Sequence, residues 1–163
     1  MPLLLTVALL AAHLPFAAAL TVFDVREHRL PNRLVLWQST CVAAVSLVAA
    51  ALLPAVRTAL PASILVAFVL GGGAVCLALL VPSALGMGDA KVVFATALVT
   101  CLLGGAVIVS ALLWFCAASA VGAVVALVRS RGDFSSRFAF GPVILSVPYG
   151  GLLVAALLAG TLP

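Results

Sequence analysis

Two aspartates are the residues whose type and position best suit chemistry. Asp24 and Asp89 each stand at the edge of a long apolar stretch, whereas Glu27 and Asp133 lie among arginines that can pair with them. A carboxylate beside lipid is costly and is therefore a functional candidate. If the two carboxyl groups meet at a low-dielectric boundary, one holds a proton while the other stays charged. The charged group can activate water and the protonated group can act as an acid, which is aspartic-protease chemistry.

The segments around the two aspartates contain residues that shape the chain. After Asp24, Leu30-Pro31-Asn32 turns the chain into the next apolar stretch, and the proline restricts that turn. Asp89 lies within Gly86-Met87-Gly88-Asp89-Ala90-Lys91. Its two glycines permit unusual backbone angles and the close approach of another segment.

Each aspartate also has a simpler interpretation. Asp89 could serve only as the N-cap of a helix, where aspartate is a preferred residue. Asp24 could be an interfacial charge that pairs with Arg26 or Arg29. The two aspartates by themselves do not decide between these interpretations and the catalytic one.

The composition predicts a membrane protein. Of the 163 residues, 66% are apolar and 7% are charged, whereas a soluble domain is about half apolar and about a quarter charged. A chain of this length lacks the interior volume to bury so many apolar side chains, so lipid must solvate them. The net charge of +4 comes mostly from basic residues in short loops and does not indicate a nucleic-acid partner.

The sequence gives no reason to expect a metal or a cofactor. The four cysteines, Cys41, Cys76, Cys101 and Cys116, lie in apolar stretches and form no CxxC pair, and the two histidines are far apart. A zinc site needs thiolates or imidazoles at ligand spacing. We interpret the cysteines as small buried hydrophobic residues.

The apolar stretches predict an all-α bundle of about six transmembrane helices in a single domain, residues 1–163. A bilayer core of ~30 Å needs about 20 apolar residues in a helix. The predicted spans are residues 1–23, 34–53, 62–81, 88–103, 106–128 and 142–162. Because no lysine or arginine precedes the first span, we expect a retained helix rather than a cleaved signal peptide. Gly71-Gly72-Gly73 in the third span is expected to allow close helix packing.

The stretch from Val92 to Val128, which carries no charge, determines where Asp89 lies. As one helix it would be ~55 Å long, far more than the thickness of a bilayer. Gly104-Gly105 is the natural hairpin that divides it. The helix before this hairpin is then short and can cross only if it begins near Gly88. Asp89 is therefore expected in the first turn of a short helix, at the membrane surface.

The basic residues predict that both aspartates face the cytoplasm. Lysine and arginine near the ends of spans prefer the cytoplasmic side. If the first, third and fifth connections are cytoplasmic, Arg57 is the one basic residue on the other side. The basic residues on the cytoplasmic side are then Arg26, Arg29, Arg33, Lys91, Arg129, Arg131 and Arg137.

Together, the two aspartate segments resemble the type IV prepilin peptidases, a family of membrane aspartic leader peptidases. Asp24 to Asn32 is similar to the family pattern D-x5-(I/L)-P-N, and Gly86 to Lys91 is similar to its GxGDxK pattern. The FGP that opens the last helix of the family is present as Phe140-Gly141-Pro142. Alone, FGP could be a loop end with a helix-starting proline, but its order and spacing favour the resemblance, which covers the whole chain.

The resemblance implies an endopeptidase that removes the short basic leader of type IV prepilins or prepilin-like proteins. The expected partners are this substrate and the lipid bilayer, and the expected location is the bacterial inner membrane, with the active site facing the cytoplasm. Longer members of the family carry an N-terminal domain, often with paired CxxC motifs, that is linked to methylation of the new pilin terminus. Because this sequence has no CxxC, we expect no methyltransferase activity.

The resemblance also implies roles for individual residues. Asp24 and Asp89 would be the catalytic pair. The supporting residues would shape the loops around the pair, with Lys91 supporting the geometry beside Asp89. These supporting residues are Gly86, Gly88, Lys91, Pro31, Asn32, Phe140, Gly141 and Pro142.

Two other functions remain open. A small transporter, or an assembly subunit of a pilus or secretion system, could use the aspartates to bind ions or protons, which predicts carboxylates along an aqueous path across the bilayer. A peptidase predicts both carboxylates at one face and within ~10 Å of each other, because such pairs act across one bound water or substrate atom. A presenilin-like intramembrane protease shares GxGD, but the D-x5-LPN segment and the short chain argue against it.

Overall fold

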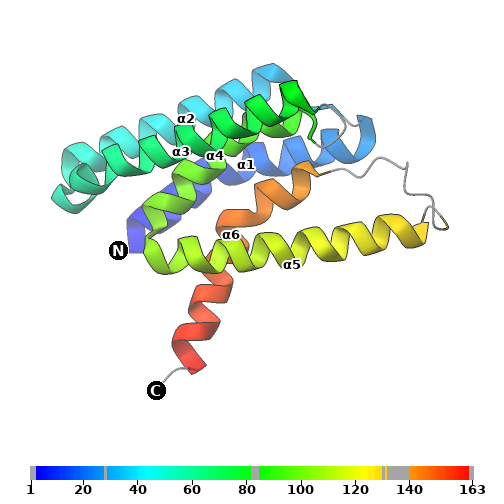
Figure 1. Cartoon of the computed structure of the whole chain (residues 1–163). Coiled ribbons are helices and arrows are strands. Elements are labelled where there is room, and N and C mark those ends of the chain that lie inside the picture. The colour runs from blue at the N-terminus through cyan, green and yellow to red at the C-terminus, as the bar shows by residue number, and fades with distance from the viewer. Residues whose placement is uncertain (1–2, 28, 82–84, 130, 132–139, 162–163) are drawn as a thin grey trace.

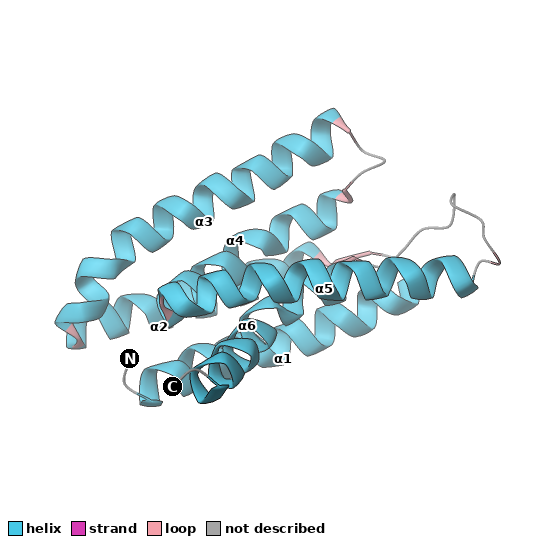
Figure 2. Cartoon of the chain, turned by 60° about the horizontal axis from the view of Figure 1, so that its bottom comes forward, coloured by secondary structure: helices cyan, strands magenta, loops and turns pink. Residues whose placement is uncertain are grey.

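The computed structural model describes residues 3–27, 29–81, 85–129, 131 and 140–161, and the regular elements in these ranges are all helices. The helices are α1 (Leu3–Glu27), α2 (Asn32–Leu52), α3 (Pro54–Leu80), α4 (Met87–Leu103), α5 (Gly105–Arg129) and α6 (Gly141–Thr161). Successive helices run in opposite directions (Figures 1 and 2), and in Figure 1 α6 crosses α5 so that its C-terminal end points away from the other helices. The prediction of an all-α bundle of six helices is confirmed.

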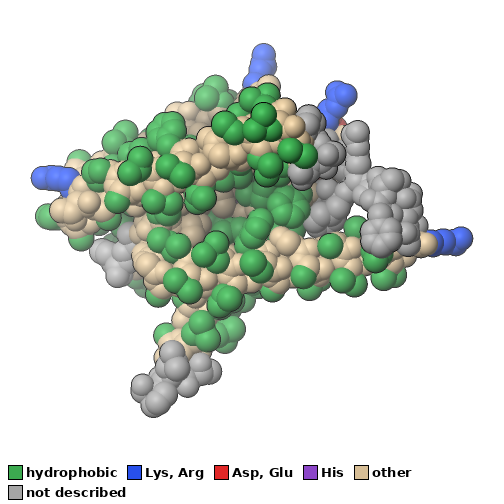
Figure 3. All heavy atoms as spheres, in the orientation of Figure 1, with side chains coloured by type: hydrophobic (Ala, Val, Ile, Leu, Met, Phe, Trp, Pro, Cys, Tyr) green, Lys and Arg blue, Asp and Glu red, His purple; other side chains and the backbone are tan. Residues whose placement is uncertain are grey.

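The helices expose their apolar side chains to the surroundings. Large hydrophobic residues such as Leu36, Phe68 and Leu113 are more than half exposed, and hydrophobic side chains are spread over the helices in Figure 3. Five helices, α1, α2, α3, α5 and α6, are long and apolar enough to cross a membrane. Exposed apolar surface on this scale needs lipid as its solvent. The chain is therefore a multi-pass membrane protein.

The remaining helix, α4, is short and central. Its 17 residues form a helix ~25 Å long, which is less than the ~30 Å bilayer core. It packs against each of the other five helices, and residues 95–100 are buried without interruption. Gly104 ends α4 with a φ of +112°, a region that favours glycine, and α5 begins at the next residue. The predictions of a short fourth helix and of a hairpin at this point are confirmed.

The predicted boundaries between the first three helices are wrong in two places. Residues 54–61 are not a connection, because α3 begins at Pro54 and contains Pro61. Proline fits the first position of a helix, where the N–H has no partner within the helix, and helices in membranes tolerate an internal proline. In addition, α1 continues to Glu27, so Asp24 lies in its last turn rather than at the start of a loop.

The side chain of Arg57 explains how the turn between α2 and α3 can be so tight. Its Nε donates to the carbonyl oxygen of Ala50 at 3.1 Å, and its Nη2 donates to that of Ala51 at 3.0 Å. The last carbonyl groups of a helix have no partner within the helix, and a basic side chain stabilises that end. Arg57 is therefore a cap for α2 rather than only a loop charge.

The three consecutive glycines of α3 lie in different environments. A Cβ on Gly71 would lie 3.2 Å from the Cβ of Phe94 on α4, whereas a Cβ on Gly72 or Gly73 would meet no atom within 4 Å. The close packing expected of this triplet therefore occurs at Gly71. At the other two positions α3 presents open space.

Replacing Gly71 by valine is expected to weaken the contact between α3 and α4, because the new side chain must displace Phe94. Overpacking of this kind lowers the free energy of unfolding by about 1–3 kcal/mol. Gly72→Val is the matched control, since its side chain enters open space. Thermal unfolding of the purified proteins in detergent measures both variants, and equal melting temperatures would contradict the packing described here.

Candidate active site

Asp24 and Asp89 come from adjacent ends of two different helices. Asp24 lies in the last turn of α1 and exposes only 5% of its surface. Asp89 lies in the first turn of α4 and is half-buried. The N-cap of α4 is Gly86, so the interpretation of Asp89 as an N-cap is wrong.

The two carboxyl groups meet over the first residue of α6. A Cβ placed on Gly141 would lie 2.6 Å from Asp24 Oδ2 and 3.2 Å from Asp89 Oδ1. The two oxygens are therefore no further apart than the sum of these distances, well within the ~10 Å in which a carboxylate pair acts on one substrate. The structure thus brings together, at one end of the bundle, two residues that are far apart in the sequence.

Gly141 is the residue that makes this meeting possible. Its backbone N–H donates to Asp24 Oδ2 at 3.0 Å, and a side chain here would collide with the Asp24 carboxyl group. The N-terminus of a helix carries a partial positive charge that stabilises an anion. The next residue, Pro142, has no N–H and fits the first turn for that reason. The first turn of α6 therefore provides a hydrogen bond that favours the ionised form of Asp24.

The two carboxyl oxygens of Asp89 lie in different surroundings. Asp89 Oδ1, the oxygen nearest the Gly141 position, is buried and has no hydrogen-bond partner among the described residues. A buried polar atom without a hydrogen bond lowers the stability of a protein, so such an atom is a candidate for a functional role. A Cβ on Gly86 would lie 3.2 Å from the other oxygen, Oδ2. Because the φ of Gly86 is an ordinary −70°, this glycine provides room rather than an unusual backbone angle.

The segments that contain the two aspartates are joined directly. Lys91 Nζ donates to Asn32 Oδ1 at 2.9 Å. A Cβ on Gly88 would lie 3.1 Å from the Cβ of Leu30, so the glycine allows the turn before α2 to approach α4. Pro31 is the N-cap of α2, and its carbonyl oxygen accepts hydrogen bonds from the N–H groups of Leu34 and Val35. The supporting residues named from the sequence thus form one connected structure around the aspartates.

A cavity of about 300 Å³ lies beside the two aspartates. Both carboxyl groups reach it, and so do two basic residues. Its lining is Asp24, Arg29, Leu30, Asn32, Gly86, Met87, Gly88, Asp89 and Lys91. Within the described residues, no group of three or more His, Cys, Asp or Glu side chains could hold a metal ion. The chemistry available here is that of two carboxyl groups in a partly enclosed space.

The helices that form the site are also joined in the interior of the bundle. The fully buried His13 of α1 places Nδ1 2.9 Å from the Tyr149 hydroxyl of α6 and Nε2 3.4 Å from Thr96 Oγ1 of α4. The sequence does not predict this contact, because the three residues lie far apart along the chain. The available signal was a polar residue inside an apolar span, which marks a buried partner.

Known proteins do not identify this site. No family model, curated protein or solved structure matches the chain.

Removal of the Tyr149 hydroxyl in a Tyr149→Phe variant is expected to lower the free energy of unfolding by about 1–2 kcal/mol, because it leaves a buried nitrogen of His13 without a partner. Thr40→Val is the control, since it also removes a hydroxyl, but from an exposed residue that bonds within its own helix. Denaturant titration in detergent measures both variants. A Tyr149→Phe variant with wild-type stability would show that this bond does not hold the helices together.

Proposed function

We propose that this protein is a membrane-embedded aspartic endopeptidase that removes the basic leader of type IV prepilins or prepilin-like proteins. The observation that carries the proposal is the convergence of the Asp24 and Asp89 carboxyl groups over Gly141. The resemblance of the three surrounding motifs to prepilin peptidases supplies the substrate class. The motif that carries Asp24 contacts the motif that carries Asp89 through the hydrogen bond between Asn32 and Lys91 and the close approach of Leu30 to Gly88. The third motif contacts Asp24 through the N–H of Gly141.

The hydrogen bonds favour different states for the two acids. Asp24 accepts the Gly141 N–H at a helix N-terminus, which stabilises its carboxylate. Two adjacent carboxyl groups favour a single shared proton. Asp89 Oδ1 has no hydrogen-bond partner within the part of the chain that the structure describes, and such an oxygen is less costly on a neutral acid than on an anion. In the resting pair Asp24 is therefore ionised and Asp89 holds the proton.

This charge distribution supports peptide hydrolysis without a covalent intermediate. Asp24 takes a proton from a water molecule as the water oxygen attacks the peptide carbonyl carbon, and Asp89 donates its proton to the carbonyl oxygen. When the tetrahedral intermediate collapses, the C–N bond breaks, Asp24 gives its proton to the leaving nitrogen, and Asp89 recovers a proton from a hydroxyl group. Both acids then return to their starting states.

The position of the site suits a substrate that is half in the membrane. The prepilin leader is basic and soluble, and the residues that follow it form an apolar helix. Asp89 is in the first turn of a helix shorter than the bilayer, and the positive-inside rule assigns this end of the bundle to the cytoplasm. A bond at the junction of leader and helix can therefore reach the acids from the cytoplasm. A transporter would instead need carboxyl groups along the bundle axis.

Replacing either Asp24 or Asp89 by asparagine is expected to lower the rate of leader removal by at least ~10² to 10⁴, because each variant removes one acid–base partner. Glu27→Gln is the matched control, since Glu27 lies one turn beyond Asp24 on α1 and is exposed. Co-expression with a precursor that carries a basic leader, followed by gel analysis of the shortened product, measures the rate. Immunoblots of the membrane fraction check that the three variants are present in equal amounts. Cleavage at the wild-type rate by either aspartate variant would refute the two-acid mechanism.

Gly141→Ala is expected to lower the cleavage rate by ~10², because a methyl group at this position displaces the Asp24 carboxyl group and a small error in catalytic geometry is that costly. Gly105→Ala is the matched control. Gly105 is also the first residue of a helix, and a Cβ there meets no atom within 4 Å. The same precursor assay compares the two, and equal rates would mean that Gly141 does not set the position of Asp24.

A further inference from the structure

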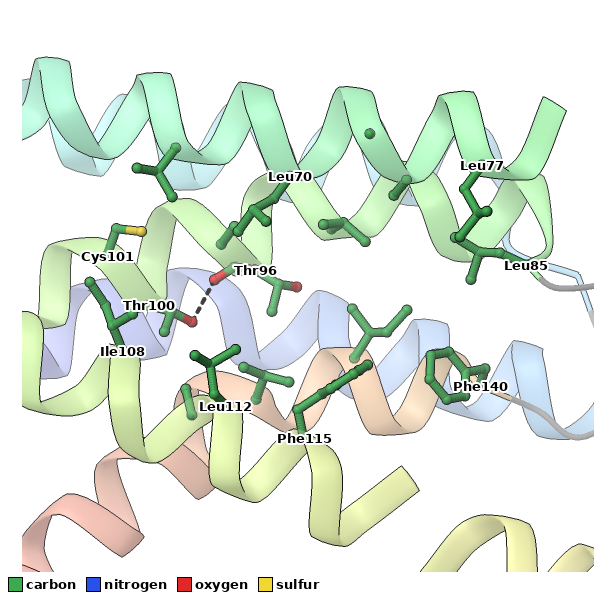
Figure 4. A pocket seen from close by; sticks show the side chains of 18 residues that line it. Leu70, Leu77, Leu85, Thr96, Thr100, Cys101, Ile108, Leu112, Phe115 and Phe140 are labelled. Carbon is green, nitrogen blue, oxygen red and sulfur yellow. Dashed lines mark hydrogen bonds between the residues drawn. The ribbon is translucent and has the colours of Figure 1, made fainter. Parts of the chain in front are cut away.

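A second hollow lies between α3 and α5, and we call it the lateral groove. It has a volume of about 520 Å³ and is lined by apolar residues of α3, α4, α5 and α6. Figure 3 shows it as a depression between the two helices, lined with hydrophobic side chains. In Figure 4 it extends from Cys101 and Ile108 at one end to Leu77, Leu85 and Phe140 at the other.

The lateral groove is open on the side that faces the bilayer. No Cα atoms of α3 and α5 lie within 8 Å of each other along the described residues, so α4 forms the floor between two separated walls. The hydroxyl groups of that floor are already bonded: Thr100 Oγ1 donates to the carbonyl oxygen of Thr96 at 2.8 Å, and Thr96 Oγ1 lies 3.4 Å from His13 Nε2. The groove therefore presents an apolar surface to a guest from the membrane.

One end of the lateral groove borders the two aspartates. Phe140 and Leu85 line that end, and Phe140 is held by an edge-on contact with Phe115 of α5, with ring centroids 5.7 Å apart. The residues that follow them are Gly141 and Gly86, which border the carboxyl groups of Asp24 and Asp89. A guest in the groove would therefore end beside the catalytic pair.

We propose that the lateral groove binds the apolar transmembrane helix of the substrate, an inference that rests on the proposed function. The groove runs ~16 Å along α3 from Val66 to Leu77, and a helix with its side chains is ~10 Å wide. Gly73 and Ala74 of α3 and Ala97 of α4 line it, and small residues of this kind let helix backbones approach closely in lipid. The bound helix lies between α3 and α5, and its cytoplasmic end presents the scissile bond to the two acids.

Gly73→Leu tests the lateral groove by filling it. A Cβ on Gly73 meets no atom within 4 Å, so the free protein accommodates leucine, but the side chain occupies the space of the guest. We expect a drop of at least tenfold in the rate of leader removal. Gly72→Leu is the matched control, because Gly72 is also open and lies outside the groove lining. Wild-type cleavage by Gly73→Leu would overturn the proposal.

A disulfide cross-link tests binding without requiring cleavage. The enzyme carries Asp24→Asn and keeps Cys101, which lines the groove, while Cys41, Cys76 and Cys116 are replaced by alanine. The probe is a precursor with a basic leader, a glycine and an apolar helix of about 20 residues, in which one cysteine is moved along the helix. We expect a cross-link at helically spaced positions in the half of the probe helix far from the leader, and its loss when Gly73→Leu is added.

The two experiments separate this proposal from the proposed function. Cross-linking to the probe, with no cleavage of the same probe by the wild-type enzyme, supports the groove and refutes the peptidase. Cleavage by the wild-type enzyme without any cross-link overturns the groove and leaves the peptidase. A cross-link between two copies of the enzyme through Cys101 also overturns the proposal, since the guest is then a second copy of the chain.

Discussion

The hydrogen bond from the Gly141 N–H to Asp24 Oδ2 is the interaction on which the site depends. It joins two residues that are 117 positions apart, at 3.0 Å. Asp24 is nearly fully buried, and a buried charge persists only where it is hydrogen-bonded or paired. The N-terminus of α6 provides that stabilisation through backbone groups, and it brings the Asp24 carboxyl group to the one place that Asp89 also reaches.

The rest of the bundle keeps this contact in register. α1, α4 and α6 carry Asp24, Asp89 and Gly141, and the same helices meet again in the interior through His13, Thr96 and Tyr149. Two layers of polar contact fix both the spacing of the helices and their positions along the bundle axis. α4 is central to both layers and shorter than its neighbours.

Length and motif arguments from the sequence predicted much of this structure. The charge-free stretch is too long for one helix, and this alone predicts the hairpin at Gly104 and the short α4. The sequence predicts a helix boundary at Pro61, although α3 extends on both sides of it, because a helix in a membrane tolerates an internal proline. The Gly141 bond has no sequence signal of its own, since a backbone N–H is the same at every residue and its partner is 117 positions away. His13 is a polar residue inside an apolar span, which indicates a buried partner, but nothing in the sequence identifies that partner as Tyr149, 136 positions away.

The proposed removal of a leader in a membrane would set two opposed requirements, because hydrolysis needs water while recognition of an apolar helix needs its exclusion. Two adjacent residues would meet these requirements in the proposed peptidase. Phe140 packs against Phe115 and lines the apolar lateral groove, whereas the next residue, Gly141, borders both carboxyl groups. Because consecutive residues at a helix start point in different directions, a single step along the chain separates the apolar surface from the acids. The FGP sequence is therefore best explained as this boundary rather than as a simple helix start.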